Sequence, residues 1–294
     1  MARRDPRNTS RFWTAPDLGD VQLLHAEFQT HRFERHVHDE LVIAVTDRGA
    51  GRFTSRGVGD IASTHAVAIF NPGEPHEGGV FDPADGWSYR GIYLGPRTLQ
   101  QLGEAVVGTR DAVPYVRHNA VADARLAQLA RAAHRALEMS QSRLARETRL
   151  IEVYAHLVGR HADTARPAAA MTHARARVAR ALQMMRERHA ENLSVADLAS
   201  SAGLSPYHFI RTFRREMGMP PHGYLTQIRL RCARRSLAAG VEPAEAALAA
   251  GFCDQSHLTK HFKRSFGITP AQYAVSHVEG RNSDQYAPGS HQPH

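Results

Sequence analysis

The sequence predicts a two-domain α+β protein. A β-rich N-terminal domain with two trailing helices precedes an all-α C-terminal domain that holds two helix-turn-helix motifs. Between about residues 21 and 95, short apolar or alternating runs are separated by Gly, Asp and Pro, which is typical of strands in a sandwich or small barrel. From about residue 123 onwards, apolar residues recur every three or four positions, as they do in helices. Near the C-terminus one helix-turn pattern occurs twice.

Length and composition agree with two globular domains. The chain has 294 residues, enough for two domains of ordinary size, and 42% of them are hydrophobic. No apolar run is long enough to span a membrane, and the basic start lacks a following apolar segment, so we expect neither a membrane partner nor a signal peptide. Cys232 and Cys253 have no CxxC spacing and predict no disulfide framework or zinc knuckle. We expect a cytoplasmic protein.

Five strands are expected in the N-terminal domain, which spans residues 21–163 and follows a flexible arm over residues 1–20. The candidate strands are Val21–Phe28, Leu41–Thr46, Gly51–Ser55, Val67–Phe70 and Tyr89–Leu94. The breaks between them are Asp47–Gly51, Arg56–Asp60 and Asn71–Gly79.

Two helices are expected to close this domain, one from about Asp123 and one over Ser142–His161. The second helix has an apolar surface wider than a single contact needs, and Leu144 and Ile151 lie on it. One interpretation is that it pairs with its copy in another subunit, which predicts a homodimer. The alternative is that both helices only pack on the strands.

Residues 164–176 form the expected linker, because Pro167 interrupts helix and no periodic apolar signal occurs. The C-terminal domain is expected over residues 177–278, and a disordered tail over residues 279–294.

The repeated pattern lies in Ala202–Tyr224 and Gly251–Tyr273. Phe213, Gly218, Pro221 and Tyr224 match Phe262, Gly267, Pro270 and Tyr273, which lie 49 residues later. Each copy carries an apolar stripe on one face of its second helix, so the other face is free to enter the major groove of double-stranded DNA. The outward residues of the first copy are Tyr207, Ile210, Arg211, Arg214 and Arg215. Those of the second copy are Gln255, Ser256, Thr259, Lys260 and Lys263.

The charge distribution supports this interpretation. Residues 165–294 contain 17 Arg or Lys and 9 Asp or Glu, a balance of +8, whereas residues 1–164 contain 20 of each kind. All of the excess positive charge therefore lies in the half with the repeat, as expected for a surface that binds phosphates.

The stretch GFCDQSHLTKHFKRSFGITPAQY, Gly251–Tyr273, resembles the AraC/XylS family of transcription regulators, and the resemblance covers about residues 177–276. It implies a seven-helix domain in which one long helix, about His222–Ala239, joins the two motifs. The two recognition helices would enter adjacent major-groove segments roughly 34 Å apart. The base-reading candidates carried over are Tyr207, Ile210, Arg211, Gln255, Ser256 and Lys260. Lys260 stands where the family often has Arg, and it lacks the bidentate fork. The outer side of the long helix is expected to carry Arg229, Arg231, Arg234 and Arg235.

The segments Phe33–Phe53 and Phe70–Gly79 resemble the cupin-like ligand-binding domain common in this family, with a His-x-His pair followed by Pro-Gly-x-x-His. The resemblance implies a pocket that hydrogen-bonds a small polar effector. The candidate effector-binding residues are His36, His38, Glu40, Glu74, His76 and Arg90. The predicted function is therefore a non-enzymatic transcription regulator controlled by a small molecule.

Three histidines also leave a divalent metal such as Zn, Fe or Ni open, held by His36, His38 and His76. The alternative function is a metal-dependent cupin enzyme with an accessory nucleic-acid-binding domain. Such enzymes place a Glu three or four residues after the His pair, but Glu40 is only two beyond His38, so we expect no cofactor. A further alternative is a constitutive DNA-binding protein whose N-terminal domain only dimerises. RNA polymerase is a possible partner, and no residue pattern separates activator from repressor.

Overall fold

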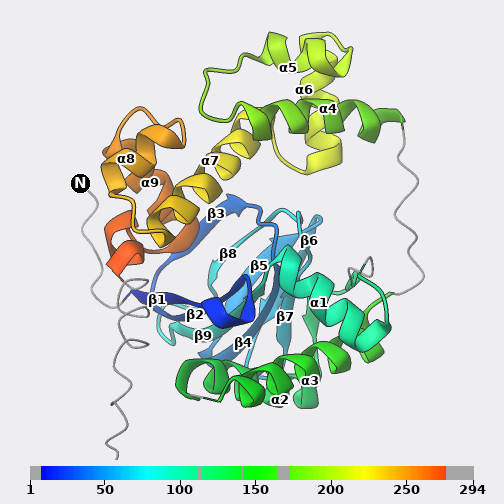
Figure 1. The fold of residues 1–294 in the computed structure, drawn as a ribbon, viewed down its shortest axis with the longest axis vertical. Coiled ribbons are helices and arrows are strands. Elements are labelled where there is room, and N and C mark those ends of the chain that lie inside the picture. The colour runs from blue at the N-terminus through cyan, green and yellow to red at the C-terminus, as the bar shows by residue number, and fades with distance from the viewer. Residues whose placement is uncertain (1–7, 111–113, 141, 164–172, 276–294) are drawn as a thin grey trace, which may run out of the picture.

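The computed structural model describes residues 8–110, 114–140, 142–163 and 173–275 (Figure 1). A β-rich N-terminal domain is followed by a helical C-terminal domain, so the predicted two-domain α+β fold is confirmed. No helix among these residues is both long enough and apolar enough to cross a membrane.

Two antiparallel sheets form the N-terminal domain. In spatial order, the six-stranded sheet consists of β1 (Thr9–Ala15), β2 (Val21–Phe28), β9 (Trp87–Leu94), β4 (Leu41–Gly49), β7 (Val67–Phe70) and β10 (Ala120–Val121). The four-stranded sheet consists of β3 (Arg32–His36), β8 (His76–Val80), β5 (Gly51–Ser55) and β6 (Val58–Ala62). A short 3₁₀ turn, Pro16–Leu18, follows β1.

Three helices cover the outer face of the six-stranded sheet: α1 (Pro96–Val107), α2 (Ala124–Met139) and α3 (Arg143–His161). The alternation of side chains along each strand separates two cores. On β4, Leu41 and Ile43 face these helices, whereas Val42 and Ala44 face the space between the sheets. The predicted strands and trailing helices are therefore present, and α1 is an addition.

The expectation of a flexible arm over residues 1–20 is wrong for residues 9–15. They form β1, an edge strand that pairs with β2 along its whole length. Phe12 on β1 is buried, so apolar contact fixes a segment whose composition looks polar. Residues 1–7 lie outside the described part of the chain.

Two segments expected to be turns also form strands, namely β6 and β8. The pair Gly78 and Gly79 in β8 is required by close approach of the neighbouring strands. A Cβ on Gly78 would lie 2.7 Å from the carbonyl oxygen of Arg52, and one on Gly79 would lie 2.7 Å from that of His31. These glycines therefore belong to a crowded sheet and not to a loop.

The C-terminal domain is helical throughout. Its named helices are α4 (His173–Glu187), α5 (Val195–Ala202), α6 (Pro206–Met217), α7 (Pro221–Ala238), α8 (Pro243–Ala249) and α9 (Gln255–Phe266), and residues 270–275 are also helical. Side chains cap several of them: Ser194 and Asp197 form a capping box on α5, and Asp254 caps α9. α5–α6 and α8–α9 are the two helix-turn-helix units, and α7 joins them.

The expected domain boundaries are only partly described. Residues 164–172 of the expected linker and all of the expected tail, residues 279–294, lie outside the described residues. Residues 173–176, also expected in the linker, belong to α4 instead. The remaining boundaries stay predictions.

The C-terminal domain packs directly on the N-terminal one. In Figure 1, α7 crosses above β3 and α9 lies beside it. One apolar cluster runs from the space between the sheets into α7, α8 and α9. In it, the ring of Phe12 lies 6.3 Å from that of Phe266 and 5.9 Å from that of Tyr273.

Candidate effector pocket and nucleic-acid interface

A pocket lies between the two sheets of the N-terminal domain. Its walls are mainly aromatic, because the inward positions of five strands carry rings. These are Phe12, Phe33, Phe53, Phe70, Trp87, Tyr89 and Tyr93. Burial raises the pKa of the Tyr93 hydroxyl well above its usual range, so the phenol stays neutral. This aromatic wall was not expected from the sequence, although the two-residue alternation along β9 is a signal that indicates it.

The C-terminal domain supplies the remaining wall. Side chains from α7 and α9 line the same pocket: Gln227, Arg231, Arg234, Ser265 and Phe266. Arg231 and Arg234 were expected on the outer side of the long helix, and that expectation is wrong. Both are buried against the N-terminal domain, with 7% and 5% exposure.

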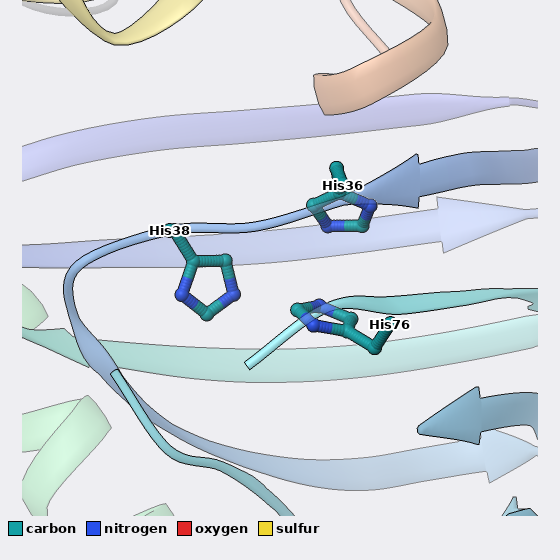
Figure 2. A group of neighbouring side chains, drawn as sticks. All are labelled: His36, His38 and His76. Atoms are coloured by element: carbon teal, nitrogen blue, oxygen red, sulfur yellow. The ribbon is translucent and has the colours of Figure 1, made fainter. Parts of the chain in front are cut away.

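His36, His38 and His76 converge at one place in this pocket (Figure 2). His36 ends β3, His38 follows it, and His76 opens β8, where it is paired with His36 across the two strands. The ring of His76 lies 4.3 Å from that of His36 and 4.8 Å from that of His38. One nitrogen from each ring lies within 4.8 Å of the other two, so the predicted grouping of the histidines is present.

Backbone carbonyls fix the orientation of all three rings. Nδ1 lies 2.8 Å from the Glu34 oxygen in His36, 3.1 Å from the Glu40 oxygen in His38, and 3.0 Å from the Glu74 oxygen in His76. A carbonyl oxygen only accepts, so each Nδ1 carries the hydrogen and donates it. The nitrogen left with a lone pair in every ring is therefore Nε2.

The histidines are uncharged at neutral pH. Burial, followed by the charge of His38, lowers the pKa of His36 to about 4. Burial also lowers the pKa values of His38 and His76. Neutral imidazoles with fixed Nδ1–H groups are the state that binds a metal ion, so the donor set fits a divalent cation of the Zn or Fe class.

Glu40 does not join the three histidines. Its Oε1 accepts a hydrogen bond from Nη2 of Arg234 on α7. Burial raises the pKa of the Glu40 carboxyl, but the charge of Arg234, the neighbouring His38 and the hydrogen bonds to the carboxylate together outweigh burial and lower it to about 2. Glu40 is therefore ionised and engaged by the other domain, in a buried ion pair across the domain interface.

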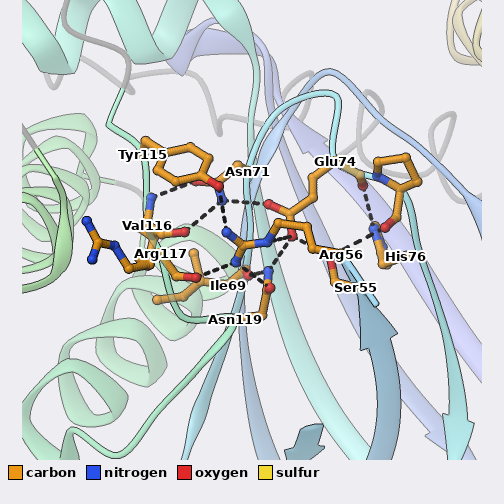
Figure 3. Close-up of polar contacts among 11 residues, drawn as sticks. Ser55, Arg56, Ile69, Asn71, Glu74, His76, Tyr115, Val116, Arg117 and Asn119 are labelled. Carbon is orange, nitrogen blue, oxygen red and sulfur yellow. Dashed lines mark hydrogen bonds and ion pairs between the residues drawn. The ribbon is translucent and has the colours of Figure 1, made fainter. Parts of the chain in front are cut away.

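Glu74 was expected in the pocket, and the structure corrects this. Its carboxylate lies in a separate polar network (Figure 3). Oε2 accepts from the Asn71 amide at 2.6 Å, and Oε1 accepts from the Asn119 amide at 2.7 Å and lies 3.1 Å from Nε of Arg56. Ser55 also donates to Oε1. Glu74 therefore holds the end of β5 to the segment before β10.

Arg90 is likewise placed away from the pocket. It lies on the face of β9 opposite Tyr89 and Tyr93, towards α2, as the alternation of the strand requires. Its guanidinium pairs with Asp47 at 2.7 Å and with Glu138 at 3.2 Å. Of the six residues expected to bind an effector, only His36, His38 and His76 line the pocket, while Glu40 is adjacent to it.

The candidate DNA-facing residues lie on the surfaces of α6 and α9. The stripes beneath them are buried, with Phe209 and Phe213 in the first unit and Leu258 and Phe262 in the second. The exposed candidates are Tyr207, Ile210, Arg211, Arg214, Arg215, Gln255, Ser256 and Lys260; Thr259 and Lys263 are partly buried. Arg211 stacks over the ring of Tyr207, 5.7 Å from its centroid.

Two families match most of the chain. Residues 18–154 match the AraC-like ligand binding domain, and residues 198–275 match the helix-turn-helix domain. The uncharacterized HTH-type transcriptional regulator YbfI of Bacillus subtilis strain 168 is 28% identical over 229 residues, which are 77% of this chain and 82% of that protein.

Solved structures share the whole fold. ToxT from Vibrio cholerae O395 aligns with 92% of this chain and 98% of its own, with a TM-score of 0.57 and 10% identity. ToxT from Vibrio cholerae strain SCE256, solved with a bound unsaturated fatty acid, aligns with 94% and 98%, with a TM-score of 0.58 and 10% identity. The pocketed β-rich domain, the tandem helix-turn-helix units and both family matches together show that this chain belongs to the AraC family, as a DNA-binding transcription regulator with an N-terminal ligand-binding domain.

Proposed function

We propose that α6 and α9 read adjacent major-groove segments of double-stranded DNA, and that an effector in the aromatic pocket controls how they are presented. The observation that carries this proposal is the shared pocket wall, to which Arg234 and Phe266 both contribute. Arg234 lies on α7, which joins the two helix-turn-helix units, and Phe266 ends α9, the recognition helix of the second unit. We call the first unit, α5–α6, the first reader and the second unit, α8–α9, the second reader. A ligand in that space changes the docking of α7 and α9, and so changes the DNA-bound population.

The direct readers are exposed residues in the N-terminal half of each recognition helix. Arg211 and Tyr207 serve the first unit, and Gln255, Ser256 and Lys260 serve the second, while Ile210 meets a thymine methyl or sugar. Arg214, Arg215, Lys263 and Thr259 contact phosphates, which fix register but carry no sequence information.

DNA binding is tested with a site selected from random duplex, measured by fluorescence anisotropy at several salt concentrations. Arg211→Ala and Lys260→Ala each weaken binding to that site by about 1–3 kcal/mol, because each removes a base contact. Arg125→Ala is the control, since this exposed arginine lies on α2 of the other domain. Equal binding of selected and random duplex would overturn the proposal.

The effector is an organic molecule with an apolar body and one polar end. The aromatic lining favours the body, and the three histidines offer hydrogen bonds to the end. This differs from the small polar effector expected from the sequence. The ligand-bound ToxT structure holds a fatty acid, which supports a largely apolar class. A thermal-shift screen tests it: a true effector stabilises the wild type, and Phe53→Ala and His38→Ala reduce that stabilisation while Arg125→Ala keeps it.

A metal-dependent version of this pocket is the second candidate. It is favoured by the three Nδ1–H groups held on carbonyls, which leave a lone pair on each Nε2, and by the grouping of the rings, since one nitrogen of each lies within 4.8 Å of the other two. A bound ion would accept those lone pairs and offer the effector's polar end a Lewis acid. Metal analysis of purified protein and of His36→Ala decides it, because the variant loses the ion only in this version.

We propose that the pocket binds and does not catalyse, because Glu40, the carboxylate that follows His38, is already paired with Arg234.

The homodimer is formed through α3. Leu144 and Ile151 stay exposed on it, seven residues apart, while Leu150 and Leu157 are buried under α2 and the sheet. Ile151→Lys is expected to halve the mass in sedimentation, whereas the exposed-site control Arg149→Lys leaves it unchanged.

The protein acts on the chromosome, so we place it in the cytoplasm. RNA polymerase is its further partner if it activates transcription, and reporter assays with the selected site decide the sign of regulation.

A further inference from the structure

A second cluster of metal-binding side chains lies on the helices of the N-terminal domain, outside the pocket. Asp123 precedes α2, and His156 and His161 lie in the last part of α3. Nε2 of His156 lies 2.9 Å from Oδ2 of Asp123, and Nε2 of His161 lies 2.7 Å from the same oxygen. All three ligand atoms lie within 4.8 Å of one another.

The carboxylate in this cluster is held in one orientation. Its Oδ1 accepts a hydrogen bond of 2.9 Å from the backbone nitrogen of Leu126, which caps α2. Oδ2 is thereby left to the two imidazoles. An outer-shell bond of this kind orients a metal-binding group before the ion arrives.

The cluster is sheltered but reachable. The side chains of Asp123, His156 and His161 are 12%, 19% and 20% exposed. Arg160 is the nearest cation, 4.0 Å from Oδ2, and its side chain is 70% exposed, so it can turn into solvent without losing packing.

We propose that Asp123, His156 and His161 form a binding site for a divalent transition cation of the zinc class, distinct from the pocket histidines. Two imidazoles and one carboxylate are the ligand types that Zn²⁺ takes, and water completes its coordination. The class excludes Mg²⁺ and Ca²⁺, which prefer oxygen ligands throughout.

The position of the site gives the ion a structural consequence. His161 ends α3, and the chain beyond it is held by Asp163, whose backbone nitrogen donates to the Tyr115 oxygen at 2.8 Å and whose carboxylate pairs with Arg117 at 2.9 Å. An ion between Asp123 and His161 fastens the end of α3 to the start of α2. It therefore fixes the place from which the chain leaves towards the DNA-binding domain.

The competing interpretation is a hydrogen-bond network without an ion, in which both histidines donate from Nε2 to the carboxylate. Glutamine distinguishes the two, because its amide also donates to a carboxylate but binds zinc far more weakly. His156→Gln/His161→Gln therefore keeps the network and removes the site. Asp123→Asn keeps the helix cap and removes the charge.

The test uses full-length protein in a His38→Gln/His76→Gln background, which silences the pocket histidines, with Zn²⁺ titrated by calorimetry and Co²⁺ followed by its visible absorption. One equivalent of zinc is expected in this background.

Adding His156→Gln/His161→Gln lowers the zinc affinity at least about 100-fold, more than loss of an outer-shell partner does. Asp123→Asn lowers it at least about 10-fold, and circular dichroism verifies that each variant folds. Absence of zinc binding, or equal binding by the Gln variant, would overturn the proposal.

Discussion

The two helix-turn-helix units share one sequence pattern but rest on different supports. In the first unit, Phe209 and Phe213 belong to a cluster formed mainly by α4, α5, α6 and the start of α7. In the second unit, Phe262 belongs to a cluster that continues into the space between the sheets. The second reader therefore shares its core with the effector domain, and the first reader has a core largely of its own.

Matched positions of the repeat make the difference concrete. Arg215 of the first unit pairs with its neighbour Glu216, whereas the matching Arg264 pairs with Glu34 on β3. Met217 stays in the first cluster, whereas the matching Phe266 lines the pocket. The repeat thus keeps the stripe that builds each unit and differs at the positions that dock it. Under the proposed mechanism, the effector therefore acts first on the second unit.

The largest expected effect comes from removing one buried phenylalanine ring from the core of each helix-turn-helix unit. Phe262→Ala and Phe213→Ala each lower the free energy of unfolding of their unit by about 3–5 kcal/mol, because both rings are fully buried. Both tryptophans, Trp13 and Trp87, lie in the N-terminal domain. Urea unfolding followed by tryptophan fluorescence therefore shifts in Phe262→Ala and stays near wild type in Phe213→Ala. Equal shifts would show that the two supports do not differ.

The next effect comes from the buried ion pair under α7. Arg234→Ala leaves the Glu40 carboxylate buried and unpaired, which costs about 3 kcal/mol in the same urea experiment. Arg231→Ala is the matched control: Arg231 is similarly buried, but its partner Asp39 is 39% exposed and is hydrated when the arginine is removed, so the loss is smaller than in Arg234→Ala. The double change Glu40→Leu/Arg234→Met removes both charges and recovers most of the stability. If it does not, the cost arises from lost packing.

The contact between the second reader and the N-terminal domain also shows which features could be predicted from the sequence and which could not. Helices and central strands followed from periodicity, which is local, so α6, α9, β2 and β5 lie where they were expected. The pocket wall formed by Arg231 and Arg234 depends on contact between domains. In the sequence, arginines on a helix look the same whether they face solvent or a buried carboxylate.

The same limit applies to the candidate site. The three histidines were expected because their pattern resembles that of the cupin-like domain, although the segment that holds His76 was expected to be a turn and forms β8. Glu40 and Glu74 looked equivalent, but their partners are distant in sequence: Arg234 for the first, and Asn119 for the second. Only the fold decides which carboxylate each donor reaches.

A pH experiment tests the burial of His36 in the pocket on which the second reader docks. His36 has a pKa of about 4 when folded against 6.5 as the ordinary value, so the unfolded chain takes up the proton first as pH falls. Stability therefore falls with decreasing pH from about 6.5, and His36 alone contributes about 2 kcal/mol of this fall on reaching pH 5. The lowered pKa values of His38 and His76 act in the same direction. Urea unfolding followed by tryptophan fluorescence at several pH values measures it. His36→Gln reduces the slope, whereas Glu40, with a pKa of about 2 against an ordinary value of 4.5, contributes to the slope only as the pH approaches 4.5 and falls below it. A flat wild-type profile would contradict the assignment.

The smallest effect is expected from an exposed ion pair at the edge of the contact between the second reader and the N-terminal domain. Arg264 and Glu34 lie 3.2 Å apart with side chains 46% and 56% exposed, so solvent screens their attraction. Arg264→Ala lowers stability by at most about 1 kcal/mol at low salt, and the difference from wild type vanishes at high salt. Arg215→Ala, at the matching position of the first unit, is the control and leaves the tryptophan transition unchanged. A large, salt-independent loss in Arg264→Ala would mean that charge, and not the shared apolar core, holds the second reader on the effector domain.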